Sequence, residues 1–154
     1  MLVSMRILMV CLGNICRSPL AQGILERKVA AQGLDWEIDS AGTGSWHIGE
    51  KPDPRSVYTA GQHGLDISAQ RARQFDRQDL KDFDLILAMD QSNYRDILRL
   101  AQSPAEAKKV KKILDYTSDE NGGDVPDPYW DDDGFEKVYQ MLDQACDALI
   151  EAHR

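Results

Sequence analysis

The sequence predicts an α/β fold: a single domain with a four-stranded parallel sheet and helices on both faces. Short apolar runs, typical of strands buried on both faces, alternate with segments that carry helix start and stop signals. The 154 residues suit one domain with one core, so we expect residues 1–154 to form a single unit. In such folds the ligand site lies at the carboxyl ends of the strands.

The expected strands follow in order. Residues 6–11 are an apolar run, and residues 36–40 alternate apolar and polar side chains before a Gly-rich loop. Residues 84–89 are the next apolar run, and residues 112–114 form a brief last strand.

Four helices are expected around this sheet. Residues 18–32 and 54–63 each have Pro near the start and Gly after the end. An Asp at position 90 can cap a helix over residues 90–100. Residues 135–152 show an apolar stripe at helical spacing, and Cys146 lies on it.

Charge and composition exclude several classes of protein. A formal net charge of −8 opposes phosphate-backbone contacts, so we expect no nucleic-acid partner. Three cysteines are too few for a secreted disulfide framework, which favours a reducing, cytoplasmic setting. Arg6 interrupts the apolar start, and no run is long enough to span a bilayer, so neither a signal peptide nor a membrane partner is expected.

Residues 10–19, VCLGNICRSP, combine a cysteine with a helix start. Cys11 ends the first strand and Ser18 begins the helix, so the thiol faces the positive end of a helix dipole and several free N–H groups. Both favour a thiolate, which makes Cys11 a candidate nucleophile. A cysteine at a buried strand end is also often a small hydrophobic residue and no more.

The rest of this loop can bind an oxyanion. Gly13 and Asn14 tolerate left-handed geometry, so successive N–H groups can point inward as a nest. Arg17 adds a planar fork that matches two phosphate oxygens. The candidate phosphate-binding residues are Leu12, Gly13, Asn14, Ile15, Cys16, Arg17 and Ser18. A nucleotide P-loop would end in Gly-Lys-Ser/Thr, and zinc needs further ligands at regular spacing, so no metal or other cofactor is expected.

A thiolate that attacks a phosphate monoester needs a proton donor near the leaving oxygen. Asp127 lies between two prolines and beside aromatic residues, which suits an acid on a rigid loop. Asp131 and Asp133 remain alternatives on composition, because a proline-flanked Asp is also an ordinary turn residue.

The loop VCLGNICRSP closely resembles the signature loop of low-molecular-weight protein tyrosine phosphatases. Residues 39–43, 71–73, 89–93 and 125–129 resemble the same family in the same order, so the resemblance spans nearly the whole chain. It implies a flavodoxin- or Rossmann-like fold of the phosphotyrosine phosphatase I type. It also implies a protein tyrosine phosphatase that acts on phosphotyrosine proteins and small aryl phosphates.

The resemblance assigns catalytic roles by matching position. Cys11 would form a phosphocysteine while Arg17 stabilises the charge, and Asp127 would serve as general acid and then base. Cys16 would be the second loop cysteine, which can form a reversible disulfide with Cys11 under peroxide.

The resemblance also implies supporting roles around the loop. Trp46 and Tyr129 would wall the pocket, and Ser40 would brace the loop together with Asn14. Gln70 stands where the family usually has histidine, so we expect a weakened or rewired brace there. Trp130 stands where many relatives carry a second tyrosine that can be phosphorylated, so this chain lacks that site.

Two other functions remain open on the sequence. A thioredoxin-coupled arsenate reductase of the same fold would need a resolving cysteine outside the loop, and Cys146 on the apolar stripe is a poor relay. A non-catalytic module that binds phosphate or phosphoproteins would need neither Asp127 nor a reactive thiolate. In each case inorganic phosphate or a similar oxyanion should bind the loop.

Overall fold

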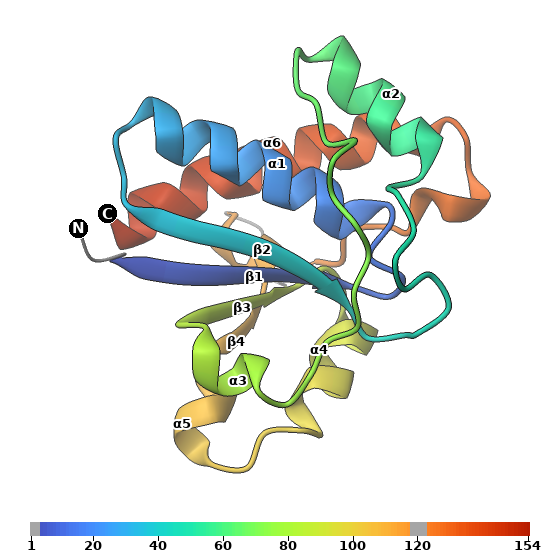
Figure 1. Cartoon of the computed structure of the whole chain (residues 1–154). Coiled ribbons are helices and arrows are strands. Elements are labelled where there is room, and N and C mark those ends of the chain that lie inside the picture. Colours follow the sequence, from blue (N-terminus) through green and yellow to red (C-terminus); the bar gives the residue numbers. More distant parts are fainter. Residues whose placement is uncertain (1–3, 118–122) are drawn as a thin grey trace.

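The sheet has four parallel strands in the order β2-β1-β3-β4 in the computed structural model, which describes residues 4–117 and 123–154 (Figure 1). The strands are β1 (Met5–Cys11), β2 (Trp36–Gly42), β3 (Leu85–Ala88) and β4 (Val110–Lys112). Strands β1 and β2 pair in register from Met5 opposite Trp36 to Cys11 opposite Gly42. The predicted parallel sheet is therefore confirmed.

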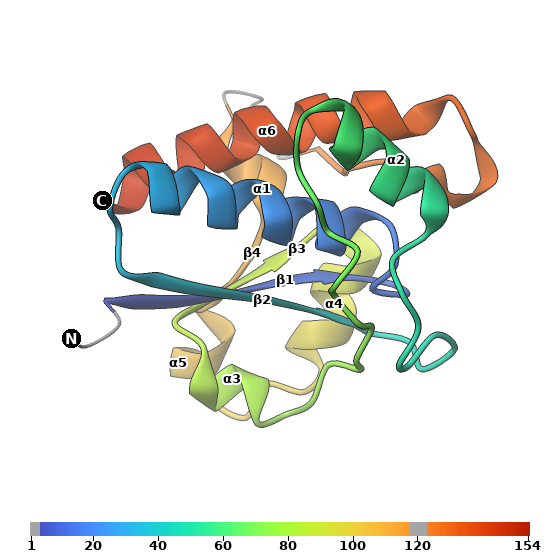
Figure 2. The same cartoon turned by 45° about the horizontal axis from the view of Figure 1, so that its top comes forward.

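Helices cover both faces of this sheet. Helices α1 (Arg17–Ala31), α2 (Pro54–Gln62) and α6 (Gly134–His153) lie on one side. The short helices α3 (Asp79–Asp82), α4 (Gln91–Leu98) and α5 (Pro104–Ala107) lie on the other, as both views show (Figures 1 and 2). None of the helices within the described ranges is long and apolar enough to cross a membrane.

Strand β1 contributes to two separate cores because its side chains alternate between the faces of the sheet. Ile7, Met9 and Cys11 pack in the cluster that contains the apolar residues of α1 and α6. Leu8 and Val10 pack in the second cluster, with apolar residues from α3, α4 and β3. This double burial explains why the strand reads as a continuous apolar run.

Two sequence predictions differ from the structure, and two short helices were not predicted. The last strand occupies Val110–Lys112, because the apolar residues predicted for it belong to a 3₁₀ turn, η1 (Ile113–Tyr116), and are buried there. Helix α1 begins at Arg17, and the Ser18 side chain contacts Cys11 instead of capping the helix. Helices α3 and α5 were not predicted, since four residues are too few to show a helical period.

Candidate active site

The phosphate-binding loop connects the end of β1 to the start of α1, over residues 12–16. Cys11 is 2% exposed, and its Sγ accepts a hydrogen bond from the Asn14 backbone N–H at 3.3 Å. The Ser18 Oγ lies 3.0 Å from the same sulfur. Asn14 has φ 56°, the left-handed conformation that turns its N–H toward the sulfur side of the loop.

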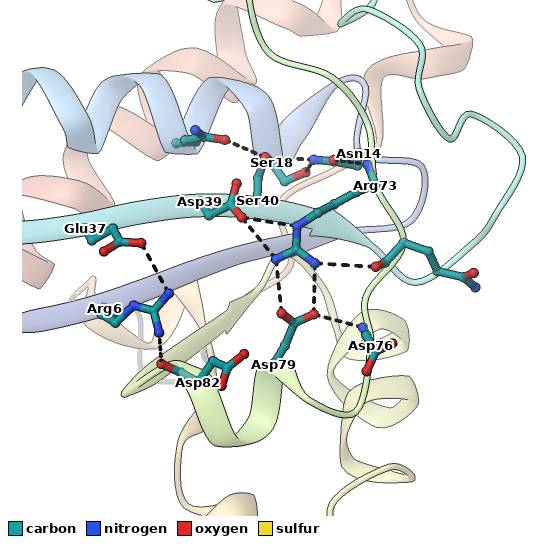
Figure 3. A network of polar contacts seen from close by, with 12 residues as sticks. Arg6, Asn14, Ser18, Glu37, Asp39, Ser40, Arg73, Asp76, Asp79 and Asp82 are labelled. Carbon is teal, nitrogen blue, oxygen red and sulfur yellow. Dashed lines mark hydrogen bonds and ion pairs between the residues drawn. The ribbon is translucent and has the colours of Figure 1, made fainter.

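The Asn14 side chain braces this loop with three hydrogen bonds (Figure 3). Its Nδ2 donates to Ser18 Oγ at 2.8 Å and to Ser40 Oγ at 2.9 Å, and its Oδ1 accepts from the Arg73 backbone N–H at 3.0 Å. Ser40 in turn donates to Gln22 Oε1 at 2.6 Å. Because Ser18 accepts from Asn14, its hydroxyl proton is free to point at the Cys11 sulfur.

Gln70 lies outside this network. Its Nε2 donates to the Pro19 carbonyl in the first turn of α1 at 3.0 Å. Its Oε1 is buried and accepts no hydrogen bond from any residue that the structure describes. The expected brace is rewired: Gln70 donates to the helix that follows the loop, while Gln22 accepts the hydrogen bond of the Ser40 hydroxyl.

Arg17 is 2% exposed, and neighbouring groups fix its guanidinium. The Nη1 donates to Asp90 Oδ2 at 2.7 Å and to the Val125 carbonyl at 3.0 Å, and Nη2 lies 3.7 Å from Asp127 Oδ2. Burial would lower the pKa of Arg17, but the negative charge of Cys11, Asp90 and Asp127 outweighs it, so that pKa lies above its usual value. The cation is therefore permanent and aimed at the loop.

Of the three candidate acids, Asp127 lines the pocket that also contains Cys11 and Arg17. Asp131 and Asp133 do not line this pocket. The Asp127 Oδ1 accepts the Tyr129 N–H at 3.1 Å at the start of a 3₁₀ turn, η2 (Pro128–Trp130). The side chain is 36% exposed, so its other oxygen can reach a bound substrate. The geometry thus separates three carboxylates that the sequence left as alternatives.

The pocket above the loop has a volume of about 340 Å³. Trp46 and Tyr129 line it, together with Leu12 and His47 from the two flanking loops. Trp130 also lines it, 87% exposed and edge-on to Tyr129 with 4.8 Å between ring centroids. Leu12, His47 and Trp130 were not predicted as walls; their adjacency to Cys11, Trp46 and Tyr129 was the only available signal.

Arg55 of α2 contacts the segment that carries Asp127 and, through Asp53, the loop between β1 and α1. It pairs with Asp132 at 2.5 Å and with Asp53 at 2.9 Å, and its guanidinium lies 5.4 Å from the Tyr129 ring centroid. The Asp53 backbone N–H donates to the Ile15 carbonyl of the phosphate-binding loop at 2.8 Å. Arg55 thereby connects the loop that carries Asp127 with the loop between β1 and α1, a role the sequence did not indicate.

The other two cysteines are buried. Cys16 is 4% exposed, and burial, reinforced by the nearby Asp53 and Cys11, raises the pKa of its thiol. Cys146 is 0% exposed on α6, where burial also raises the pKa of its thiol. All three cysteines are free thiols, and among the described residues no cluster of His, Cys, Asp and Glu side chains could hold a metal ion.

Comparison with known proteins places this site in a family. The sequence model described as "Low molecular weight phosphotyrosine protein phosphatase" matches residues 6–154. The low molecular weight protein-tyrosine-phosphatase YfkJ of Bacillus subtilis is 41% identical over 146 residues, which cover 94% of this chain and 92% of that protein. The low molecular weight phosphotyrosine protein phosphatase of Sus scrofa is 37% identical over 155 residues, covering 99% and 98%.

Solved structures agree with this assignment. The crystal structure of YfkJ superposes with a TM-score of 0.90 at 39% identity, covering 96% of this chain and 93% of that chain. A Drosophila arginine phosphatase superposes with a TM-score of 0.91 at 34% identity, covering 97% and 98%. With these matches over nearly its full length, the chain belongs to the low molecular weight phosphotyrosine protein phosphatase family.

Proposed function

We propose that the chain hydrolyses phosphotyrosine in proteins, and small aryl phosphates, through a phosphocysteine on Cys11. One observation carries the proposal: Cys11 Sγ accepts the Asn14 backbone N–H and shares a pocket with Arg17, whose Nη2 is 3.7 Å from Asp127 Oδ2. A nucleophile, an anion clamp and a proton donor therefore share one pocket.

In the first step the Cys11 thiolate attacks phosphorus, so that an S–P bond forms while the bond to the phenolic oxygen breaks. Asp127, entering as the carboxylic acid, gives its proton to that departing oxygen. The inward N–H groups of the loop and the Arg17 guanidinium stabilise the charge on the equatorial phosphate oxygens. Neighbouring groups already hold Arg17 and Asn14, so these two residues need little reorganisation when the charge develops.

In the second step a water molecule attacks the phosphocysteine. Asp127, now a carboxylate, takes a proton from that water, the P–O bond forms, and the S–P bond breaks. The sulfur leaves as a thiolate, and the Ser18 hydroxyl, 3.0 Å away, donates to it and stabilises it. Inorganic phosphate is the product and, with vanadate and similar oxyanions, a competitive ligand of the same loop.

The pocket walls support an aryl substrate. Trp46, Tyr129 and Trp130 present aromatic surface to a ring that projects from the phosphate site. The Drosophila relative is named an arginine phosphatase, so the corresponding phosphoarginine peptide is the comparison that tests this preference. A reducing, cytosolic compartment suits the chemistry because the Cys11 sulfur must stay reduced and not be oxidised.

Two rivals fit the geometry less well. An arsenate reductase would need a resolving cysteine beyond the loop, but Cys146 is fully buried against the Ala21 carbonyl. A binding module would not need a carboxylate in the pocket, yet Asp127 lines it and faces Arg17. Both observations favour hydrolysis.

The decisive experiment measures p-nitrophenyl phosphate hydrolysis by the wild type, Cys11→Ser and Asp127→Ala without added metal. Cys11→Ser should lose activity but retain vanadate or phosphate binding, and Asp127→Ala should lose about a hundredfold in kcat. Matched phosphotyrosine and phosphoarginine peptides then define the substrate. Full activity in Cys11→Ser would refute the mechanism, and faster release of phosphate from phosphoarginine would refute the assigned substrate.

A further inference from the structure

Two carboxylates from different elements, Asp39 and Asp79, bind the guanidinium of Arg73 (Figure 3). Asp79 of α3 accepts from both of its terminal nitrogens, at 3.0 and 3.1 Å, and Asp39 of β2 lies at 3.1 Å. Asp79 is only 6% exposed and also accepts the Asp76 N–H at 2.9 Å. Burial would lower the pKa of Arg73, but these carboxylates raise it above its usual value.

The backbone of Arg73 lies between the end of strand β2 and the phosphate-binding loop. Its carbonyl accepts the Gly42 N–H at 2.9 Å, and its N–H donates to Asn14 Oδ1 at 3.0 Å. Strand β2 is at the edge of the sheet, and the segment around Arg73 meets only its last residue through an isolated bridge. Backbone hydrogen bonds also join Ala72 to Gly49 and Glu50, and Phe75 to Gly42. The ion pairs of the Arg73 side chain add to these bonds in fixing the segment.

The contact with Asn14 orients the amide that braces the loop. The Nδ2 end of Asn14 has two hydroxyl acceptors, and its Oδ1 end has the Arg73 N–H. Asn14 itself holds φ 56°, a conformation that a non-glycine residue adopts at a cost and keeps only when its surroundings fix it. Displacing Arg73 would remove one of the three bonds that fix it.

We propose that Asp79 and Arg73 form a positioning pair for catalysis, which holds the Arg73 N–H against Asn14 and so keeps the phosphate-binding loop in its catalytic shape. The proposal rests on the proposed function and extends it to residues that touch neither substrate nor Cys11. Loop N–H groups act most strongly on the charge that develops in the transition state. Loss of the pair should therefore lower kcat and leave KM nearly unchanged.

The first test compares variants that remove the pair with one that removes an equivalent pair elsewhere. Asp79→Asn keeps the shape of the side chain and removes its charge, and Arg73→Lys keeps the charge but not the two-pronged contact. Glu37→Gln is the matched control. Glu37 lies on β2, the strand that also carries Asp39, and the substitution removes its 3.2 Å pair with Arg6, which is remote from Asn14 (Figure 3). We expect kcat to fall about tenfold in Asp79→Asn, less in Arg73→Lys, and not at all in the control.

A double-mutant cycle separates positioning from general support of the fold. If Asp79 acts through Asn14, then Asp79→Asn should lower kcat about tenfold in the wild type but less than about twofold in an Asn14→Ala background. A purely structural ion pair would lower kcat by the same factor in both backgrounds. Thermal unfolding of each variant shows that the compared proteins are folded at the assay temperature.

Each outcome decides the proposal. Unchanged kcat in Asp79→Asn, or equal losses in the two backgrounds, would overturn it; if Asp79→Asn does not fold, Arg73→Lys enters the same cycle and decides in its place. The proposed function fails by a different result, full activity in Cys11→Ser. The two failures are therefore distinguishable.

Discussion

Arg17 and Asp90 form a charged hydrogen bond of 2.7 Å where the loops after β1 and β3 meet. Asp90 uses its two oxygens separately: Oδ1 accepts the Asn93 N–H and caps α4, and Oδ2 holds Arg17. The contact occupies Arg17 Nη1 together with the Val125 carbonyl. Among the described residues, Nε and Nη2 of the guanidinium have no hydrogen-bond acceptor, so both are available to an anion in the proposed phosphate site.

A graded series at Asp90 tests this division of labour. Asp90→Asn keeps the size and a capping oxygen but loses the charge, so we expect kcat/KM to fall about tenfold. Asp90→Ser still caps α4 but is too short to reach Arg17, and the loss should approach a hundredfold. Vanadate affinity, measured alongside, should weaken in the same order. Wild-type activity in Asp90→Ser would show that Arg17 is oriented without Asp90.

Arg55 should affect the reaction through proton donation, because it holds the loop that carries Asp127. Arg55→Met removes the pairs with Asp132 and Asp53 and replaces the guanidinium, which lies 4.7 Å from the Phe135 ring centroid, by an uncharged side chain of similar length. Phenolate is a stronger base than p-nitrophenolate, so its departure depends more on the acid. We expect kcat/KM to fall about tenfold for phenyl phosphate and less than about threefold for p-nitrophenyl phosphate.

The matched control for that prediction is Lys28→Met on α1, which removes pairs with Asp143 and Asp147 far from the pocket lining. It should leave the ratio of the two substrates unchanged. Equal losses for both substrates in Arg55→Met would mean that Arg55 supports the pocket and not the acid.

Gln70 should matter less than the histidine that the family usually carries there. Gln70→Leu removes the bond to the Pro19 carbonyl but also removes a buried oxygen that has no donor among the described residues. These effects oppose each other, so we expect the free energy of unfolding to change by less than about 1 kcal/mol and kcat by less than about twofold. Ser40→Ala, which deletes an Asn14 partner, should lower kcat more. If kcat fell as much in Gln70→Leu as in Ser40→Ala, Gln70 would support the phosphate-binding loop as strongly as Ser40 does, and the prediction would be wrong.

The predictable part of this protein is the part that is local in sequence. Two strands were predicted from continuous apolar runs and β2 from alternating apolar and polar residues, and the loop from Cys11 to Ser18 was predicted because its residues are adjacent. The last strand was misplaced because Ile113 and Leu114 are as apolar as a strand but are buried in a turn.

The pairs that position the site could not be predicted in the same way. Asp132 lies 77 positions from Arg55 in the sequence, and any of 26 acidic and 18 basic residues could have paired. Asp79 is close to Arg73 in sequence, so this ion pair alone could have been predicted. Its proposed role depends on the contact between the Arg73 backbone and Asn14, which lies 59 positions away. Tertiary structure alone creates these connections.

The disulfide that the family resemblance implies between Cys11 and Cys16 should form at a rate that depends on pH. A sulfenic acid on Cys11 condenses with the Cys16 thiol to a disulfide and water, and the attacking species is the Cys16 thiolate. Burial raises the pKa of Cys16, so at neutral pH the thiol form dominates and its thiolate fraction increases as pH rises. The rate of disulfide formation should therefore increase about tenfold per pH unit between pH 7 and 9.

The measurement forms the sulfenic acid with a brief peroxide pulse, removes peroxide with catalase, and follows the loss of dimedone-reactive Cys11. Cys16→Ser is the control and should keep that reactivity, whereas a rate that does not change with pH would contradict the role of the buried thiol.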